Sequence, residues 1–205
     1  MKKSLFITFE GIEACGKSTQ ARLLTDRLIN DGFQVTLTRE PGGPPISEMI
    51  REILLDLNNF VMAPETELLL FMAARSQHTF ECIKPCLENG MIVISDRYSD
   101  STLAYQGAAR KLDLDFIKKV NKFATYGLNP DLTFLLDLPI EYTIERVANK
   151  KKDRVELESY EFHKNVRDAF IALSKEEKRF ILLDATKSIT ELSNKIYSIV
   201  NKTMR

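Results

Sequence analysis

The residues whose types and spacing most clearly indicate a chemical role lie near the start of the chain, where residues 11–18 read GIEACGKS. This spacing fits the pattern G-x-x-x-x-G-K-[ST], in which two glycines let the backbone close tightly around phosphate groups. The N–H groups of the loop and of the helix that follows form a nest for anions. Lys17 can reach the β- and γ-phosphates of a nucleoside triphosphate, and the Ser18 hydroxyl can ligate Mg²⁺. The sequence therefore predicts a triphosphate-binding loop rather than a simple tight turn.

A second chemical pair, Asp96 and Arg97, follows the apolar segment 91–94. In a parallel sheet this strand end should lie beside the phosphate loop. A carboxylate there can hold Mg²⁺ through its water shell, so we expect Ser18 and Asp96 to form the metal site. The neighbouring guanidinium is suited to bidentate contact with phosphate. An ordinary surface ion pair at a strand end is the alternative explanation.

The elements that must position these residues alternate between strands and helices. Apolar β-rich runs predict strands at 5–9, 34–38, 91–94, 132–138 and 180–183. Helical spacing predicts helices at 17–30, 46–57, 64–88 and 188–202, the third with a possible kink before Pro85. Strands separated by helices pair in parallel, and strands that are apolar throughout are covered on both faces. The predicted fold class is therefore α/β: a doubly wound, five-stranded parallel sheet with helices on both faces, as in P-loop NTPases.

Length and charge limit the remaining possibilities. The 205 residues suit a single domain over 1–205, and 29 basic residues balance 29 acidic ones. Without a global basic field, we expect neither nucleic acid nor a membrane surface as a partner. The apolar run after the first residues is too short for a signal peptide, and no stretch approaches the ~20 apolar residues of a membrane span. We therefore expect a cytoplasmic protein.

Two other classes of phosphate-loop protein lack support in the sequence. A GTPase needs an Asn-Lys-x-Asp motif, but the Asn-Lys pairs at residues 121, 149 and 194 lack the aspartate. A typical ATPase ends a strand with Asp-Glu, whereas residues 95–97 and 136–138 here read SDR and LDL. Neither segment supplies a glutamate that activates water. The pattern favours a kinase.

Four further segments carry a family resemblance. Residues 38–43 read TREPGG, 68–78 read LLLFMAARSQH, 96–107 read DRYSDSTLAYQG and 162–167 read FHKNVR. In this order they resemble the motifs of the thymidylate kinases, over residues of about 4 to 185. The resemblance implies transfer of the γ-phosphate of ATP to dTMP, with Mg²⁺ as cofactor, in dTTP synthesis. It also implies a homodimer, for which the apolar faces of 46–57 and 64–88 are candidates.

The resemblance assigns roles at the nucleoside end of the acceptor. It implies that Phe71 stacks on the thymine ring and that Arg75 hydrogen-bonds the edge of the base. Ser101 and Gln106 also reach the base, and Tyr105 packs beside the deoxyribose, where a 2′-hydroxyl would be crowded. These types suit the task, because an aromatic face binds any base while directed hydrogen bonds choose among them. Taken from periodicity alone, Phe71 and Tyr105 would be assigned to the core.

At the phosphate end, the resemblance implies that Arg39 and Arg97 hold the 5′-phosphate of the acceptor. Glu13 is expected to contact the 3′-hydroxyl or its water. Position 14 departs from the family, because Ala14 stands where members have Gly or a catalytic Arg. Another cation must then balance the charge of the transferring phosphoryl group. We expect it from Arg154, in a lid at about 147–158 that resembles the Arg-x-Glu lid of bacterial members.

The predicted triphosphate contacts are the loop residues and two further positions that the resemblance places near the adenine. They are Gly11, Ile12, Glu13, Ala14, Cys15, Gly16, Lys17, Ser18, Thr19, Arg146 and Ala185. The predicted catalytic residues are Lys17, Arg97, Arg154 and Glu13. Two alternatives stay open at this point: a deoxynucleoside kinase with a different acceptor, and a nucleotide-dependent switch without catalysis.

Overall fold

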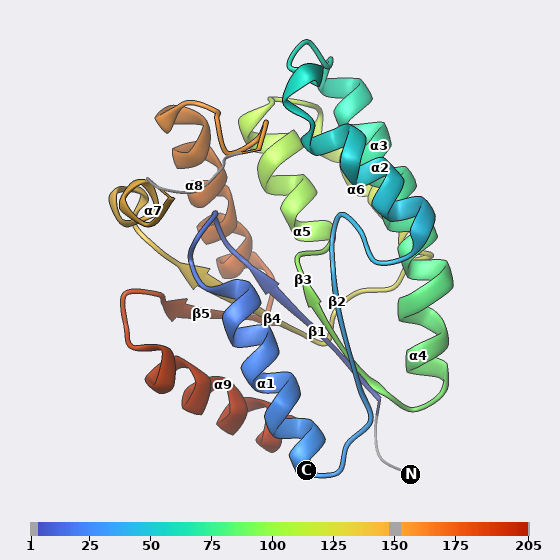
Figure 1. Ribbon diagram of the computed structural model, residues 1–205, viewed down its shortest axis with the longest axis vertical. Coiled ribbons are helices and arrows are strands. Elements are labelled where there is room, and N and C mark those ends of the chain that lie inside the picture. Colours follow the sequence, from blue (N-terminus) through green and yellow to red (C-terminus); the bar gives the residue numbers. More distant parts are fainter. Residues whose placement is uncertain (1–3, 148–152, 205) are drawn as a thin grey trace.

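A computed structural model describes residues 4–147 and 153–204, and it is built on one parallel sheet (Figure 1). The strands lie in the order β2-β3-β1-β4-β5. They are β1 (Leu5–Glu10), β2 (Val35–Arg39), β3 (Ile92–Asp96), β4 (Leu132–Asp137) and β5 (Phe180–Asp184). All four pairings are parallel, which confirms the predicted fold class and all five predicted strands to within two residues at each end.

Helices connect these strands. They are α1 (Lys17–Asn30), α2 (Pro45–Leu55), α3 (Pro64–His78), α4 (Lys84–Glu88), α5 (Ser99–Thr102), α6 (Leu114–Ala124), α7 (Ile140–Val147), α8 (Tyr160–Glu176) and α9 (Ile189–Met204). The helix predicted at 64–88 is interrupted by a π-helical turn at Thr79–Ile83, just before Pro85. Proline has no N–H to donate to the preceding turn, which explains the interruption at this point. Within the described ranges, no helix has the length and apolarity needed to cross a membrane.

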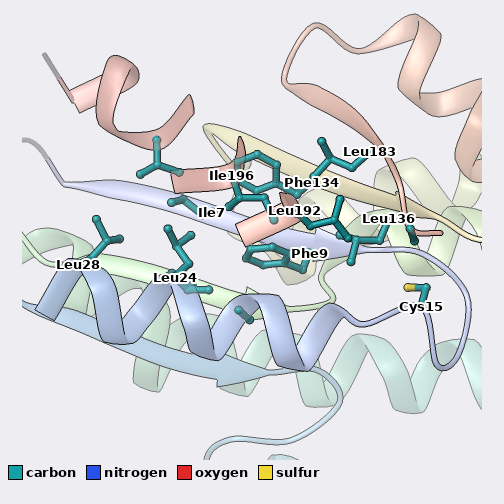
Figure 2. Packing of buried hydrophobic residues seen from close by; sticks show 14 of the residues in the cluster. Ile7, Phe9, Cys15, Leu24, Leu28, Phe134, Leu136, Leu183, Leu192 and Ile196 are labelled. Atoms are coloured by element: carbon teal, nitrogen blue, oxygen red, sulfur yellow. The ribbon is translucent and has the colours of Figure 1, made fainter. Parts of the chain in front are cut away.

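Alternate residues of β1 point to opposite faces of the sheet, as strand geometry requires. Ile7 and Phe9 pack with Leu24 of α1 and Ile196 of α9 on one face (Figure 2). Phe6 points to the other face and packs with other buried side chains, among them Tyr98. Figure 1 shows α1 and α9 side by side, and they are in contact. The sheet is therefore covered on both faces at its centre, which is why most residues of β1, β3 and β4 are apolar and buried, whereas the edge strand β2 (VTLTR) is more polar and more exposed.

The strands β1, β2 and β3 end at nearly the same level of the sheet, at the edge where the predicted site lies. Phe9 of β1 and Arg39 of β2 both lie opposite Asp96 of β3. Glu10, the last residue of β1, and Arg97, just beyond β3, therefore lie at the same edge. Parallel sheets bind ligands at this edge, and the register brings predicted residues from three separate segments together there.

Candidate active site

The phosphate loop joins β1 to α1 and packs against the end of β4. Gly11 has a φ of 135°, and a Cβ on this residue would lie 2.5 Å from the carbonyl oxygen of Leu136 and 2.9 Å from Sγ of Cys15. Neither the backbone angle nor the space admits a side chain. The Cys15 side chain is buried under the loop, in the core cluster of α1 and the sheet (Figure 2). Glycine at position 11 is thus a requirement of close packing.

Three predicted groups meet at the start of α1. The Nζ of Lys17 donates a 2.8 Å hydrogen bond to the carbonyl of Ile12, so its ammonium lies across the loop. The Ser18 hydroxyl donates to the carboxylate of Asp96, from β3. A hydroxyl and a carboxylate in contact beside a phosphate loop are the oxygen donors that suit Mg²⁺. The residues present therefore fit the predicted metal site.

Arg97, Glu13 and Tyr105 form a compact hydrogen-bonded cluster beside the loop. The Arg97 Nη2 lies 3.0 Å from both Glu13 Oε1 and the Tyr105 hydroxyl, and this hydroxyl donates a 2.5 Å bond to the same carboxylate oxygen. The Arg97 Nη1 donates to the carbonyl of Gly11 at 2.9 Å and to the Ser101 hydroxyl at 3.2 Å. The Arg97 guanidinium is therefore held by three separate parts of the chain: the phosphate loop, Ser101 and Tyr105.

The same cluster sets the charge state of its members. Burial opposes ionisation of Glu13, but a contact with His163 and the charges of Arg97 and Lys17 outweigh it and hold its pKa below the ordinary value. Burial also opposes the Arg97 cation, while Tyr105 and Glu13 raise the pKa of the guanidinium. At neutral pH this part of the site therefore holds a fixed cation beside a fixed anion.

The predicted base-binding residues surround the other end of the site. Arg75 is buried and bonds to Glu40, while Phe71 is half-buried. Gln106 donates its amide to Glu67 at 2.8 Å, and the Ser101 hydroxyl donates to Glu10 at 2.6 Å. Each polar side chain is thus held by a carboxylate.

One open cavity of about 410 Å³ joins the two ends. Its lining includes the predicted residues Glu13, Ala14, Lys17, Ser18, Arg39, Phe71, Arg75, Asp96, Arg97, Ser101, Tyr105 and Gln106. The structure therefore brings together the metal pair, the phosphate-loop lysine and every residue predicted for the acceptor.

Comparison with known proteins agrees with this arrangement. A family profile described as thymidylate kinase matches residues 9–196. The chain belongs to the thymidylate kinase family. A thymidylate kinase from Geotalea daltonii is 50% identical over 195 residues, covering 91% of each chain, and one from Halothermothrix orenii is 49% identical over 199 residues, covering 95% of each. The crystal structure of thymidylate kinase from Ehrlichia chaffeensis superposes with a TM-score of 0.75 at 32% identity, covering 99% of both chains.

Arg154, the cation that the resemblance to thymidylate kinases supplies from the lid, lies elsewhere. It is buried, its Nη2 lies 2.7 Å from Glu67 Oε2, and its Nε donates to the carbonyl of Leu54 at 3.0 Å. It is not among the described residues that line the cavity, although its neighbours Asp153 and Val155 are. In this conformation the structure does not bring Arg154 together with Lys17 and Arg97. Residues 148–152 of the predicted lid lie outside the described ranges.

The two residues predicted near the adenine lie in different surroundings. The exposed Arg146 donates a 3.0 Å bond to the carbonyl of Ala14. Ala185 is buried, and its N–H donates to the carbonyl of Asp137 at 2.8 Å. Arg146 therefore contacts the loop directly, whereas Ala185 fixes the turn after β5 to the end of β4.

Several charged residues at the site were not predicted from the sequence. Glu10 and Glu40 hold predicted residues, His163 Nδ1 lies 3.5 Å from Glu13 Oε2, and Arg51 lines the cavity while donating to the carbonyl of Pro41 at 2.7 Å. Glu40 and His163 stand inside motifs that mark the thymidylate kinase resemblance, which is the signal that could have found them. Arg51 was hidden in an amphipathic helix, where a charged residue is normally assigned to a solvated face.

Proposed function

We propose that this chain is a thymidylate kinase that transfers the γ-phosphoryl group of ATP to dTMP, giving ADP and dTDP for dTTP synthesis. The observation that carries the proposal is the continuous cavity, in which a phosphate loop faces a pocket with an aromatic face and buried hydrogen-bonding groups. We also propose that the protein works in the cytoplasm as one kinase domain over residues 1–205, with a lid at about 147–158.

At the ATP end, Lys17 balances charge on the β- and γ-phosphates, and the loop N–H groups from Gly11 to Thr19 hold the phosphate oxygens. Ser18 and, through water, Asp96 would hold Mg²⁺, which would neutralise charge on the same phosphates. Arg146 covers the adenine, and the backbone around Ala185 reads its edge. Support for the Arg146 role comes from its contact with the loop carbonyl of Ala14.

At the dTMP end, Phe71 stacks on thymine while Arg75, Ser101 and Gln106 offer hydrogen bonds to its edge. The described contacts of Arg75 are made by Nε, by Nη1 (to Thr102, Asn121 and, at 3.9 Å, Met72 Sδ) and once by Nη2, so one Nη2 hydrogen has no partner among the described residues. Tyr105 packs beside the deoxyribose. Bound dTMP would then fill the part of the cavity that lies between Phe71 and the fixed cation Arg97.

Arg97 and Arg39 hold the 5′-phosphate, and Glu13 accepts from the 3′-hydroxyl or its water. The second oxygen of Glu13 is buried, and among the described residues it makes only the long 3.5 Å contact with His163 Nδ1, so it can accept a further hydrogen bond, which supports this assignment. Because the attacking oxygen belongs to a phosphate that is already anionic, the reaction needs no strong general base. Alignment and electrostatic stabilisation by Lys17 and Arg97 carry the catalysis. Arg154 completes the set when the lid carries it to the γ-phosphate.

A homodimer fits the exposed apolar side chains that lie on α3 and α6 and in the turns directly after them. Leu69, Phe80, Phe123 and Tyr126 are each more than half exposed, and Phe123 reaches 82%. The rings of Phe80 and Tyr126 lie 6.2 Å apart, so these side chains form one surface across the two segments. An apolar surface of this kind on a soluble kinase is typical of a subunit interface.

The test is ADP formation with ATP, Mg²⁺ and one acceptor at a time: dTMP, dUMP, dGMP or thymidine. We expect dTMP to be the best substrate, because the pocket offers both a base-stacking face and phosphate-binding arginines. Phosphorylation of thymidine in preference to dTMP would identify a nucleoside kinase. Tight ATP binding without ADP release on addition of any acceptor would identify a switch.

A further inference from the structure

A buried network connects the predicted base-binding arginine to a histidine that never reaches the cavity. The Arg75 Nε donates a 2.7 Å bond to Glu40 Oε2, and His78 Nδ1 lies 2.9 Å from Glu40 Oε1. His78 Nε2 lies 2.7 Å from the hydroxyl of Thr38, near the end of β2. The side chains of Arg75, Glu40 and His78 are 2%, 3% and 0% exposed. Because these side chains are buried, water could replace these hydrogen bonds only if the core opened.

The orientation of Arg75 depends on Glu40. Its Nη1 donates to Thr102 of α5 and to Asn121 of α6, and its Nη2 donates to the carbonyl of Tyr98, just after β3. Glu40 is its partner on the β2 side, and the bond is made to Nε, at the base of the planar guanidinium. Because the guanidinium is planar, a change in the direction of the Nε bond rotates the whole group, including the Nη2 hydrogen that has no partner among the described residues. Glu40 must therefore be held in one place.

His78 supplies that constraint. The two carboxylate oxygens of Glu40 each have one charged or polar partner, Arg75 on one side and His78 on the other. Without His78, Oε1 would be a buried acceptor without its partner, and the carboxylate would be free to rotate. The ring also packs under the glycine turn that follows, since a Cβ on Gly43 would lie 2.9 Å from His78 Cδ2. His78 thus contacts both ends of the loop that carries Glu40.

We propose that His78 is a positioning residue for the nucleoside end of the acceptor, acting through Glu40 to fix the guanidinium of Arg75. This inference rests on the proposed function, because it assigns Arg75 to the base of dTMP. His78 itself does not touch the substrate. It is distinguished from ordinary core packing by a polar contact on each ring nitrogen.

The charge of the ring agrees with this role. Burial disfavours the imidazolium, but contacts with Cys82 and with the Glu40 carboxylate outweigh it and raise the pKa of His78 to about 9. At neutral pH both ring nitrogens then carry hydrogens, so one donates to Glu40 and the other to Thr38. The ring is therefore a double donor between a strand and a carboxylate.

Two substitutions separate the two ring contacts. In His78→Asn the side-chain amide can occupy the place of Nδ1 and keep the bond to Glu40, whereas in His78→Gln it reaches the place of Nε2 and keeps the bond to Thr38. We expect His78→Gln to raise the KM for dTMP about tenfold, because the lost bond involves a charged group. His78→Asn should stay close to the wild-type KM. Neither variant should change the KM for ATP, and kcat should fall less than the dTMP KM rises.

Thr38→Val is the control, since it removes the strand contact and leaves the bond to Glu40. We expect its KM for dTMP to match that of the wild type. If His78→Asn and His78→Gln lose thermal stability but both keep the wild-type KM for dTMP, His78 is structural only and the proposal is overturned. The same conclusion follows if Thr38→Val itself raises the KM for dTMP about tenfold, a result that can be obtained even where a His78 variant fails to fold. Failure of the wild type to phosphorylate dTMP would instead overturn the proposed function.

Discussion

The position of Arg154 leads to a prediction that separates a catalytic role from a structural one. The arginine lies 2.7 Å from Glu67, a carboxylate that also accepts from Gln106 and from both Nε and Nη2 of Arg110. Arg110 also pairs with Glu158 at 2.6 Å. To reach the γ-phosphate, Arg154 must leave Glu67, which keeps its other partners. Arg154→Ala therefore removes a potential catalytic cation and one of several contacts of a buried carboxylate.

The two effects have different sizes. Removing one preorganised donor to the transition state costs about 10²–10³ in kcat. Breaking a buried pair costs about 3–5 kcal/mol when the remaining charge is uncompensated. Glu67 stays compensated by Arg110, so we expect a smaller loss, about 1.5–3 kcal/mol, that of a hydrogen bond to a charged group. For a chain of this size, at about 2–4 °C per kcal/mol, that loss lowers the melting temperature by about 3–12 °C.

The assay measures kcat at saturating ATP and dTMP, well below the melting temperature of each variant. Arg110→Ala is the matched control, because it takes donors from the same carboxylate and leaves Arg154 in place. We expect both variants to lose stability, and only Arg154→Ala to lose about a hundredfold in kcat with little change in the KM for ATP. If Arg154→Ala keeps kcat within about threefold of wild type, its role is structural. If Arg110→Ala loses kcat equally, the effect comes from disturbing Glu67.

Three further predictions follow from the site and the surface. Asp96→Asn should lower kcat and raise the Mg²⁺ concentration needed for half-maximal activity, as measured by Mg²⁺ titration; an unchanged requirement would remove Asp96 from the metal site. Burial and the nearby Asp100 raise the pKa of Glu10 from 4.5 to about 7, so the folded state binds more protons than the unfolded state between these values. Stability should therefore fall as pH rises from about 5 to about 7, by at most about 1.4 kcal/mol per pH unit from this group. Urea denaturation of Glu10→Gln should give a flatter profile, and an equally steep one would contradict the argument. Phe123→Glu should yield monomers by light scattering, whereas Ile189→Glu, an equally polar change at a 59% exposed residue on α9, should leave the dimer intact; a dimer with Phe123→Glu would place the interface elsewhere.

Much of the site could be predicted because the sequence marks it locally. The loop from Gly11 to Ser18 is a continuous motif, Asp96 is the last residue of β3, and Arg97 follows it directly. Parallel pairing then fixes where these segments meet, since strand ends in register share one edge of the sheet. Local pattern and a general rule of sheet topology were therefore sufficient for the fold and for most cavity residues.

The partners of the charged residues could not be predicted in the same way. Arg154 meets Glu67 from a distant part of the sequence, and Arg97 meets Glu13 across 84 positions. With 29 basic and 29 acidic residues, the sequence allows many such pairs and ranks none of them. The choice depends on side-chain directions and on burial, which appear only after the helices have packed. That is why the lid arginine was expected at the phosphates and lies beside a buried carboxylate.

Four arginines proposed to serve the reaction are each paired with a glutamate, and their burial indicates which pairs must change when substrates bind. The side chains of Arg39 and Glu48 are 55% and 37% exposed, so water screens this pair and a phosphate can replace the carboxylate at little cost. Arg75 and Glu40 are almost fully buried, so this pair should persist in the complex and act as fixed scaffolding. Arg97 keeps Glu13 as a neighbour inside the cavity. Arg154 is the exception, a buried pair that must open, and this is feasible because Glu67 retains other donors.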